Sequence, residues 1–207
     1  MHFLGGKESK IQEHLLKAAY DDGVLLFAAS GNSGTDVKEY PASYPCVISV
    51  SAVGEDEEYA SFSNFNDQVE LVGPGVNIKS TTPGNSYGIL SGTSMAAPHV
   101  AGAAALLWSF FPECSNQQIR NVLASTARDV NPSKTSSGCN IKTGFGLVQA
   151  KAAFDVLATF GCDAAGGHDT LPLSDRAEGG CHTLSNTLKT IADIPSTQTP
   201  TNTPTLR

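Results

Sequence analysis

The chain has 207 residues, of which 40% are hydrophobic and 16% are charged. This balance suits one globular domain or a piece of a larger one, and it excludes a disordered or collagen-like chain. The formal net charge of −7 argues against the broad cationic surface that nucleic acids and anionic lipids require. The longest nearly uncharged apolar run, from Met95 to Phe111, is interrupted by Pro98 and His99 and is shorter than a bilayer crossing needs. We therefore expect neither nucleic acid nor a membrane as a partner.

Helix and buried strand follow each other in the first part of the chain. Apolar residues recur at helical spacing over 11–19 and predict a helix that stops before Gly23. The continuously apolar run 24–29 comes next and is typical of a parallel strand buried on both faces. Two more strands are predicted over 47–53 and 69–72, each closed by turn-forming residues. This order predicts an α/β fold with a mainly parallel sheet and helices on both faces.

Three helices are predicted in the second part of the chain. The first is the long apolar helix 94–110, in which Pro98 is tolerated because we expect it in or near the first turn. Ser115 is a suitable N-cap for the second helix, 117–127, and the third helix, 148–157, follows a glycine-rich turn. Beyond these helices the hydrophobic periodicity fades.

The five cysteines contain no Cys-x-x-Cys pair and no nearby histidine cluster, so a zinc site is not expected. They permit one or two disulfides and a spare thiol. By position, Cys139 with Cys162 is the favoured pair, because these residues flank the last predicted helix. Other pairings stay open, since connectivity cannot be deduced from sequence alone.

Two polar residues are candidates for chemistry. Ser94 stands among small residues at the start of the long apolar helix, where free N–H groups and the helix dipole favour a developing negative charge. It is a candidate nucleophile, but a serine there is also a common helix cap. Asn32 lies in a glycine-rich turn after the first buried strand, where open α/β sheets bind ligands. Its amide could donate to an oxyanion, although asparagine is also frequent in turns for conformational reasons.

The segment Gly-Thr-Ser-Met-Ala-Ala-Pro-His-Val-Ala-Gly at 92–102 closely resembles the nucleophile motif of the subtilisin family of serine proteases. The resemblance covers about residues 3 to 158 and extends in the expected order along the chain. The other segments that carry it are 4–6, 29–32, 40–45, 60–64, 73–75 and 144–150.

The resemblance implies that Ser94 attacks the scissile carbonyl and that Asn32 donates a side-chain hydrogen bond to the tetrahedral intermediate. The backbone N–H of Ser94 would be the second donor. Two backbone segments would form opposite walls of the pocket for the side chain before the scissile bond, and a carboxylate would lie at its floor. These pocket residues are Leu4, Gly5, Gly6, Ala29, Ser30, Gly31 and Glu39. A carboxylate at the floor would favour Lys or Arg, whereas a solvated loop glutamate is the alternative.

The general base is missing from this pattern. The family supplies the Asp and the His of its triad from segments that precede the nucleophile, and nothing here corresponds to them. His99 follows Ser94 by five residues, about 140° around the helix axis, and His14 lies on the solvent face of the first helix. We therefore predict that this chain alone is nearly inactive and is the C-terminal part of a longer protease. The alternatives are a non-catalytic pseudo-protease or peptide-binding remnant, and a half that docks with an N-terminal partner.

The resemblance predicts an α/β subtilisin-like three-layer fold with a mainly parallel sheet, its N-terminal part absent. Residues 1–160 would form the C-terminal portion of a peptidase domain, 161–194 a poorly patterned extension, and 195–207 a Pro/Thr-rich linker or tail. An α/β-hydrolase esterase fits poorly, because the segment around Ser94 lacks the second glycine of the nucleophile elbow.

The expected partners are a protein or peptide substrate and a missing N-terminal segment or half. No organic cofactor is expected; structural calcium could bind carbonyls at Ala42, Tyr44 and Val47 with Glu70 nearby. The family implies an extracellular or secretory location. No signal peptide is visible at the N-terminus, so either the protein is intracellular or its real beginning is missing.

Overall fold

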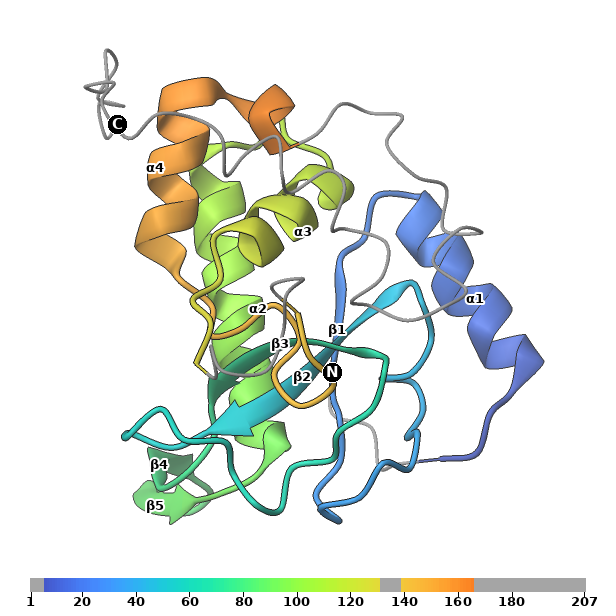
Figure 1. Cartoon of the computed structure of the whole chain (residues 1–207), viewed down its shortest axis with the longest axis vertical. Helices are drawn as coiled ribbons and strands as arrows, with labels where there is room; N and C mark the ends of the chain where they lie inside the picture. Colours follow the sequence, from blue (N-terminus) through green and yellow to red (C-terminus); the bar gives the residue numbers. More distant parts are fainter. Residues whose placement is uncertain (1–5, 131–138, 166–207) are drawn as a thin grey trace.

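The computed structural model describes residues 6–130 and 139–165, and its centre is a three-stranded parallel sheet (Figure 1). The strands β1 (Leu26–Ala29), β2 (Val47–Val53) and β3 (Val69–Pro74) lie side by side in this order. β2 is buried along its whole length because it is the central strand. The predicted α/β class with a parallel sheet is confirmed, although β1 starts two residues later than its apolar run.

Helices cover both faces of this sheet. Successive strand residues point to opposite faces, so Val47 contacts a cluster formed with α1 while Ile48 belongs to the larger core with α2. α1 (Lys10–Asp21) contributes Leu16 and Tyr20 to the smaller cluster. Figure 1 shows α1 apart from the helices that pack around the larger core. These are α2 (Thr93–Phe110), α3 (Asn116–Ser125), α4 (Ala150–Phe160) and the short 3-10 helix η1 (Cys162–Ala165).

The helix ends follow local capping rules. The predicted N-cap Ser115 is confirmed: its hydroxyl accepts the N–H of Gln118, and the side chain of Gln118 accepts the N–H of Ser115. α4 starts at Ala150, two residues later than predicted. α2 starts at Thr93, so Pro98 is its sixth residue and lies just past the first turn rather than in it. Within the described part of the chain, no helix is both long and apolar enough to cross a membrane.

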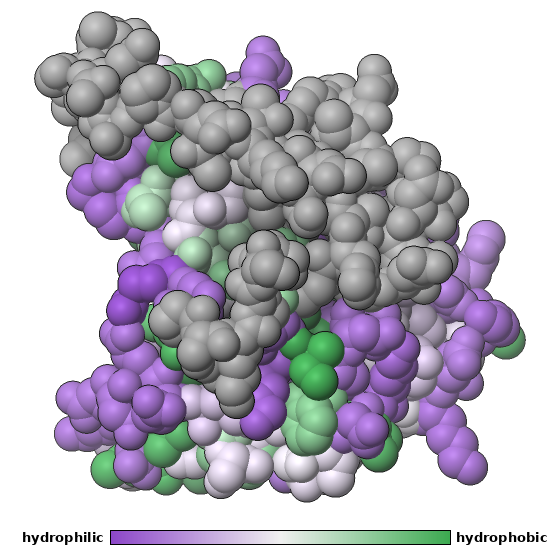
Figure 2. Space-filling model, in the orientation of Figure 1, coloured by the Kyte–Doolittle hydropathy of each residue, from purple (hydrophilic) through white to green (hydrophobic). Residues whose placement is uncertain are grey.

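An antiparallel hairpin, which the sequence pattern does not predict, leads into α2. β4 (Ile78–Thr82) and β5 (Ser86–Leu90) pair in antiparallel fashion, and Asn85 in their turn has a φ of 55°. Both strands are largely exposed, so their sequences lack the apolar alternation of a half-buried strand. The hairpin lies at the lower left of Figure 1, and in the same corner of Figure 2 hydrophilic and hydrophobic residues lie side by side.

A buried ion pair ties the sheet to α3. Nε of Arg120 donates to Oε1 of Glu70 at 2.7 Å, and Nη2 donates to Oε2 of the same carboxylate. Nη1 donates to the carbonyl of Pro45 at 3.0 Å. Burial alone would lower the pKa of Arg120, but the adjacent carboxylate holds that pKa above its ordinary value. The guanidinium therefore stays charged and joins β3, α3 and the loop before β2.

The disulfide prediction is wrong. Cys162 pairs with Cys114, not with Cys139, and the two Cα atoms are 5.3 Å apart. The reason is tertiary: η1 packs against α3, which begins just after Cys114. Cys139 is also disulfide-bonded. Cys46 is a free, buried thiol, and burial raises its pKa.

Candidate active site

Ser94 is the second residue of α2. The N-cap is Gly92, so the interpretation of Ser94 as the cap is wrong. Its side chain is half-buried, and in residues 6–130 and 139–165 no hydrogen bond of its hydroxyl or its backbone N–H is found. A backbone N–H at this position has no intrahelical acceptor. The start of α2 therefore presents a hydroxyl and a free N–H next to each other, at the positive end of the helix dipole.

Asn32 is held against this helix start by the residue that precedes Ser94. Oδ1 of Asn32 accepts the backbone N–H of Thr93 at 2.9 Å and lies 2.9 Å from the Thr93 hydroxyl, which can donate to it. Both bonds engage the oxygen of the amide, which leaves Nδ2 as its remaining donor group. A Cβ at Gly92 would lie 3.4 Å from this Nδ2. The structure thus brings the two predicted catalytic segments together, although Asn32 and Thr93 are 61 residues apart.

A fully buried asparagine fixes the turn that carries Asn32. Oδ1 of Asn64 accepts the N–H of Ser33 at 2.8 Å and that of Thr35 at 3.5 Å, and Nδ2 donates to the carbonyl of Val37 at 3.3 Å. A Cβ at Gly31 would lie 2.4 Å from Nδ2 of Asn64, so this contact requires a glycine. Asn64 lies in the family segment 60–64, and neither its role nor that of Thr93 was predicted from the sequence. The role of Asn64 depends on its complete burial, which only the folded structure shows, and on an amide group that can both donate and accept hydrogen bonds.

The predicted pocket residues lie around this turn. Ala29 is the last residue of β1, and Ser30 follows it directly. The Ser30 hydroxyl donates to the carbonyl of Asn64 at 3.3 Å. Cγ of Glu39 would be 3.0 Å from a Cβ at Gly31, so the Glu39 side chain passes directly beside the turn. The structure therefore places 29–31, the second wall of the predicted pocket, next to Glu39, the residue expected at the pocket floor.

Gly6 belongs to the first wall and reaches the same region through Tyr40. The two residues form an antiparallel bridge in which the Gly6 N–H donates to the Tyr40 carbonyl at 3.2 Å and the Tyr40 N–H donates to the Gly6 carbonyl at 3.4 Å. Burial raises the pKa of Tyr40. Because Tyr40 follows Glu39 in the chain, the bridge places Gly6 next to the expected floor residue. Leu4 and Gly5 lie outside the described residues.

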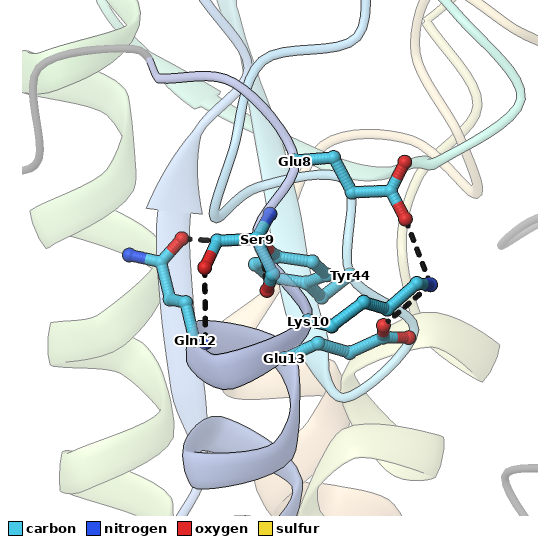
Figure 3. Close-up of polar contacts among 6 residues, drawn as sticks. All are labelled: Glu8, Ser9, Lys10, Gln12, Glu13 and Tyr44. Atoms are coloured by element: carbon cyan, nitrogen blue, oxygen red, sulfur yellow. Dashed lines mark hydrogen bonds and ion pairs between the residues drawn. The ribbon is translucent and has the colours of Figure 1, made fainter.

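The segment after Gly6 is anchored by Tyr44 (Figure 3). The Tyr44 hydroxyl accepts the N–H of Ser9 at 2.8 Å and donates to the Ser9 carbonyl at 2.9 Å. Ser9 is the N-cap of α1, so its bonds to Tyr44 fix the point at which the segment after Gly6 enters the helix. Lys10 lies 2.8 Å from Glu8 and 3.0 Å from Glu13, and hydrogen bonds to these carboxylates raise its pKa.

No base accompanies Ser94 in the described part of the chain. No hydrogen bond joins its hydroxyl to a His, Asp or Glu side chain there. Nδ1 of His99 lies 2.7 Å from the Met95 carbonyl, and its exposed ring belongs to α2 itself. His14 is exposed on α1. The other three histidines, His2, His168 and His182, lie outside the described residues.

The loop considered for calcium has a different partner for its carboxylate. Arg120 holds Glu70, and the Tyr44 carbonyl accepts the Val47 N–H at 2.9 Å. The carboxylate considered for the cation is therefore already engaged by a guanidinium, and the calcium site stays a prediction. Among the described residues, the single cluster with metal-ligand spacing is Glu113 with Cys114 and Cys162, whose thiols are joined in the disulfide.

Comparison with known proteins supports the resemblance. A family model described as the subtilase family matches residues 4–146. Subtilisin BL and Subtilisin Savinase of Lederbergia lenta are each 48% identical to this chain over 141 residues, which is 68% of this chain and 50% of either relative. Subtilisin DY of Bacillus licheniformis is 43% identical over 155 residues, covering 72% of this chain and 54% of that protein.

The fold is also similar to a solved structure. The psychrophilic subtilisin-like protease Apa1 from the Antarctic psychrotroph Pseudoalteromonas sp. AS-11 matches with a TM-score of 0.67 at 23% identity, covering 74% of this chain and 69% of Apa1. The chain spans about half the length of the curated relatives it matches. Since the family model matches well over half of its residues, the chain belongs to the subtilase family.

Proposed function

We propose that this chain forms part of a serine endopeptidase that hydrolyses peptide bonds through a Ser94 acyl-enzyme. The observation that carries the proposal is the junction of Asn32 with the start of α2. There the Thr93 N–H and hydroxyl engage the amide oxygen of Asn32. Among residues 6–130 and 139–165, Nδ2 of Asn32 and the Ser94 N–H keep no hydrogen-bond acceptor, so both donors stay available near the start of α2.

Each group then has a defined part in the reaction. Oγ of Ser94 attacks the scissile carbonyl and loses its proton to a base, and Nδ2 of Asn32 and the Ser94 N–H donate to the oxygen that becomes negative. Return of the proton to the leaving amine frees the first product and leaves the acyl group on Ser94. Water then attacks the ester and restores the hydroxyl. These donors favour the transition state because they are already oriented before the charge develops.

The base in this proposal is a histidine, oriented by an aspartate, that residues outside the described part of this chain supply. Without it, turnover in such a triad falls by about 10⁶. We therefore propose that the chain alone is nearly inactive. The absence of a base beside Ser94 among the described residues equally favours a second candidate, a non-catalytic peptide-binding protein that retains the cleft.

The proposed substrate is an extended protein or peptide segment. The backbone groups of Gly6 and of 29–31 would pair with it in strand fashion. The carboxylate of Glu39, beside Gly31, would favour Lys or Arg before the cut. No organic cofactor enters this scheme, and we propose an extracellular or secretory location by analogy with the family.

Labelling with a fluorophosphonate separates the two candidates, because acylation of a serine at a useful rate needs a base whereas peptide binding does not. We expect slow or no labelling of this chain alone and rapid labelling of Ser94 once the base is supplied, with Ser94→Ala as the unlabelled control. Failure of Ser94 to react in every preparation that binds peptide would favour the non-catalytic candidate.

A further inference from the structure

The loop between Asn32 and Glu39 joins the two parts of the candidate site. Asn32 carries the expected oxyanion donor, and Glu39 is the residue expected at the pocket floor. All residues from 32 to 38 except Gly34 are exposed, so burial of their own side chains does not set their positions. Exposed side chains make few packing contacts. The shape of the loop therefore depends on hydrogen bonds to another segment of the chain.

That segment is 62–66, which runs along the loop. The Phe62 carbonyl accepts the Gly34 N–H at 2.7 Å, and the Phe65 N–H donates to the Thr35 carbonyl at 2.9 Å. These backbone bonds hold the middle of the loop.

Asn64 contacts the loop along most of its length. Its backbone N–H donates to the Gly31 carbonyl at 2.9 Å. Its Oδ1 accepts the N–H groups of Ser33 and Thr35, and its Nδ2 donates to the Val37 carbonyl. The side chain is fully buried, so solvent does not compete for these bonds. One amide group therefore holds both ends of the loop.

The Glu39 side chain lies beside the same amide. A Cβ at Gly31 would lie 2.4 Å from Nδ2 of Asn64 and 3.0 Å from Cγ of Glu39, so both side chains lie against this glycine. Ser33, whose N–H Asn64 binds, directly follows Asn32. A displacement of the Asn64 amide would therefore move the residue next to the oxyanion donor together with the support of the pocket floor.

We infer that Asn64 is a positioning residue that sets both the orientation of the Asn32 amide and the place of the Glu39 carboxylate. It touches no substrate in this scheme and acts through the loop. Stabilisation of the oxyanion and preference for the residue before the cut then depend on one buried side chain. The inference rests on the proposed function, which assigns the oxyanion to Asn32 and the pocket floor to Glu39.

Peptide binding to the full 207-residue chain tests the inference without a base. The probes are acetylated tetrapeptides that end in Arg or Phe, each with a free carboxylate or as the amide. A terminal carboxylate puts a charged oxygen at the place of the developing oxyanion, so the acid-to-amide affinity ratio reports on the Asn32 donor. The Arg-to-Phe ratio reports on the Glu39 carboxylate. We expect each ratio to be about tenfold in the parent.

Asn64→Ala should lower both ratios by about fivefold, because the turn and the pocket floor lose their common support. Asn32→Ala should lower only the acid-to-amide ratio, and Glu39→Gln only the Arg-to-Phe ratio. In a chain that already carries Asn32→Ala, adding Asn64→Ala should not lower the acid-to-amide ratio further, because Asn64 acts through Asn32. A general loss of stability would not produce this dependence.

The matched control is Asn66→Ala, which removes another buried asparagine of the same segment. Nδ2 of Asn66 also donates to the Val37 carbonyl at 3.3 Å, but in the described part of the chain none of its hydrogen bonds reaches 31–35. Its two ratios should stay within about twofold of the parent, while its unfolding temperature falls as in Asn64→Ala. Asn64→Ser is the second variant if the alanine chain does not fold. Its hydroxyl is too short to reach Ser33 and Val37 together, so it should give the same pattern.

Unchanged ratios in folded Asn64→Ala, or equal changes in Asn66→Ala, would overturn the inference. So would ratios of one in the parent, because there would then be no preference for Asn64 to set. The fluorophosphonate test judges the proposed function separately. Ratios that depend on Asn64 in a chain whose Ser94 never reacts would leave the positioning role standing and overturn the proposed function. A reactive Ser94 with ratios that do not depend on Asn64 would have the opposite meaning.

Discussion

The sheet has two outer edges, one along β3 and one along β1. The described chain provides backbone partners along β3, which we call the closed edge, and none along the outer side of β1, which we call the open edge. Beside β3, residues 144–148 supply backbone partners, and the carbonyl of Glu70 accepts the Phe145 N–H at 2.8 Å. Beside β1 there is an apolar groove, and the polar groups of the candidate site lie just beyond the end of that strand. One edge of a sheet can therefore be fully hydrogen-bonded while the other edge, next to the candidate site, keeps unpaired backbone groups, because each edge strand pairs independently of the other.

Loss of the buried guanidinium should have the largest effect on the closed edge. Arg120→Ala leaves the Glu70 carboxylate buried without its ion-pair partner, and such a change costs about 3–5 kcal/mol of unfolding free energy. Urea unfolding measures this loss. The double variant Glu70→Leu with Arg120→Met removes both charges and should recover most of it. Equal losses in the single and double variants would contradict the ion-pair explanation.

At the open edge, the largest effect should be on reaction rate. Asn32→Ala removes the side-chain donor to the oxyanion, and we expect kcat for a peptide ester to fall by about 10² to 10³ in a preparation where Ser94 is active. KM should change little, because the donor acts mainly in the transition state. Ser33→Ala is the control, since Asn64 binds its backbone and not its side chain. An unchanged rate in Asn32→Ala would remove Asn32 from the mechanism.

A methyl group at Gly144 should disturb the closed edge by a smaller amount. This glycine has a φ of 55°, and a Cβ would lie 2.1 Å from the carbonyl oxygen of Glu70, so Gly144→Ala should cost about 2–3 kcal/mol. Thermal unfolding measures the loss. Gly84→Ala is matched to it, because Gly84 has a φ of 84° but nothing within 4 Å of the added Cβ. The control should cost only about 1 kcal/mol, and equal losses would show that contact with β3 does not matter.

The smallest effect concerns an exposed pair near the closed edge. Arg128 bonds to Leu147 through its backbone and to Glu57 through its guanidinium, and this side-chain hydrogen bond lowers the pKa of Glu57. The contribution of the pair to stability is present above the ordinary pKa of a glutamate and is lost as pH falls through the lowered value. Glu57→Gln should therefore reduce stability slightly at neutral pH and not in strong acid. Thermal unfolding at both pH values, with and without salt, tests this sign.

Short-range patterns in the sequence were sufficient for most elements. Apolar periodicity predicted α1, the unbroken apolar run predicted β1, and the N-cap Ser115 predicted the start of α3, because each depends on residues within a turn or a strand of one another. The hairpin of β4 and β5 was missed because exposed strands carry no apolar alternation. Family motifs then identified Ser94 and Asn32 as candidates, but their roles in chemistry stay predictions.

Contacts between residues that are far apart in the sequence depend on how the helices and strands pack. The sequence by itself determined the α/β class, the main helices and strands, and the residues that carry the family motif. Only the tertiary structure showed that Cys162 pairs with Cys114, that Asn64 fixes the turn of Asn32, and that Thr93 engages its amide oxygen. Local patterns reflect interactions between near neighbours in the chain, whereas these contacts depend on how whole elements pack. For the same reason, the open edge of β1 became visible only once the strands were placed side by side.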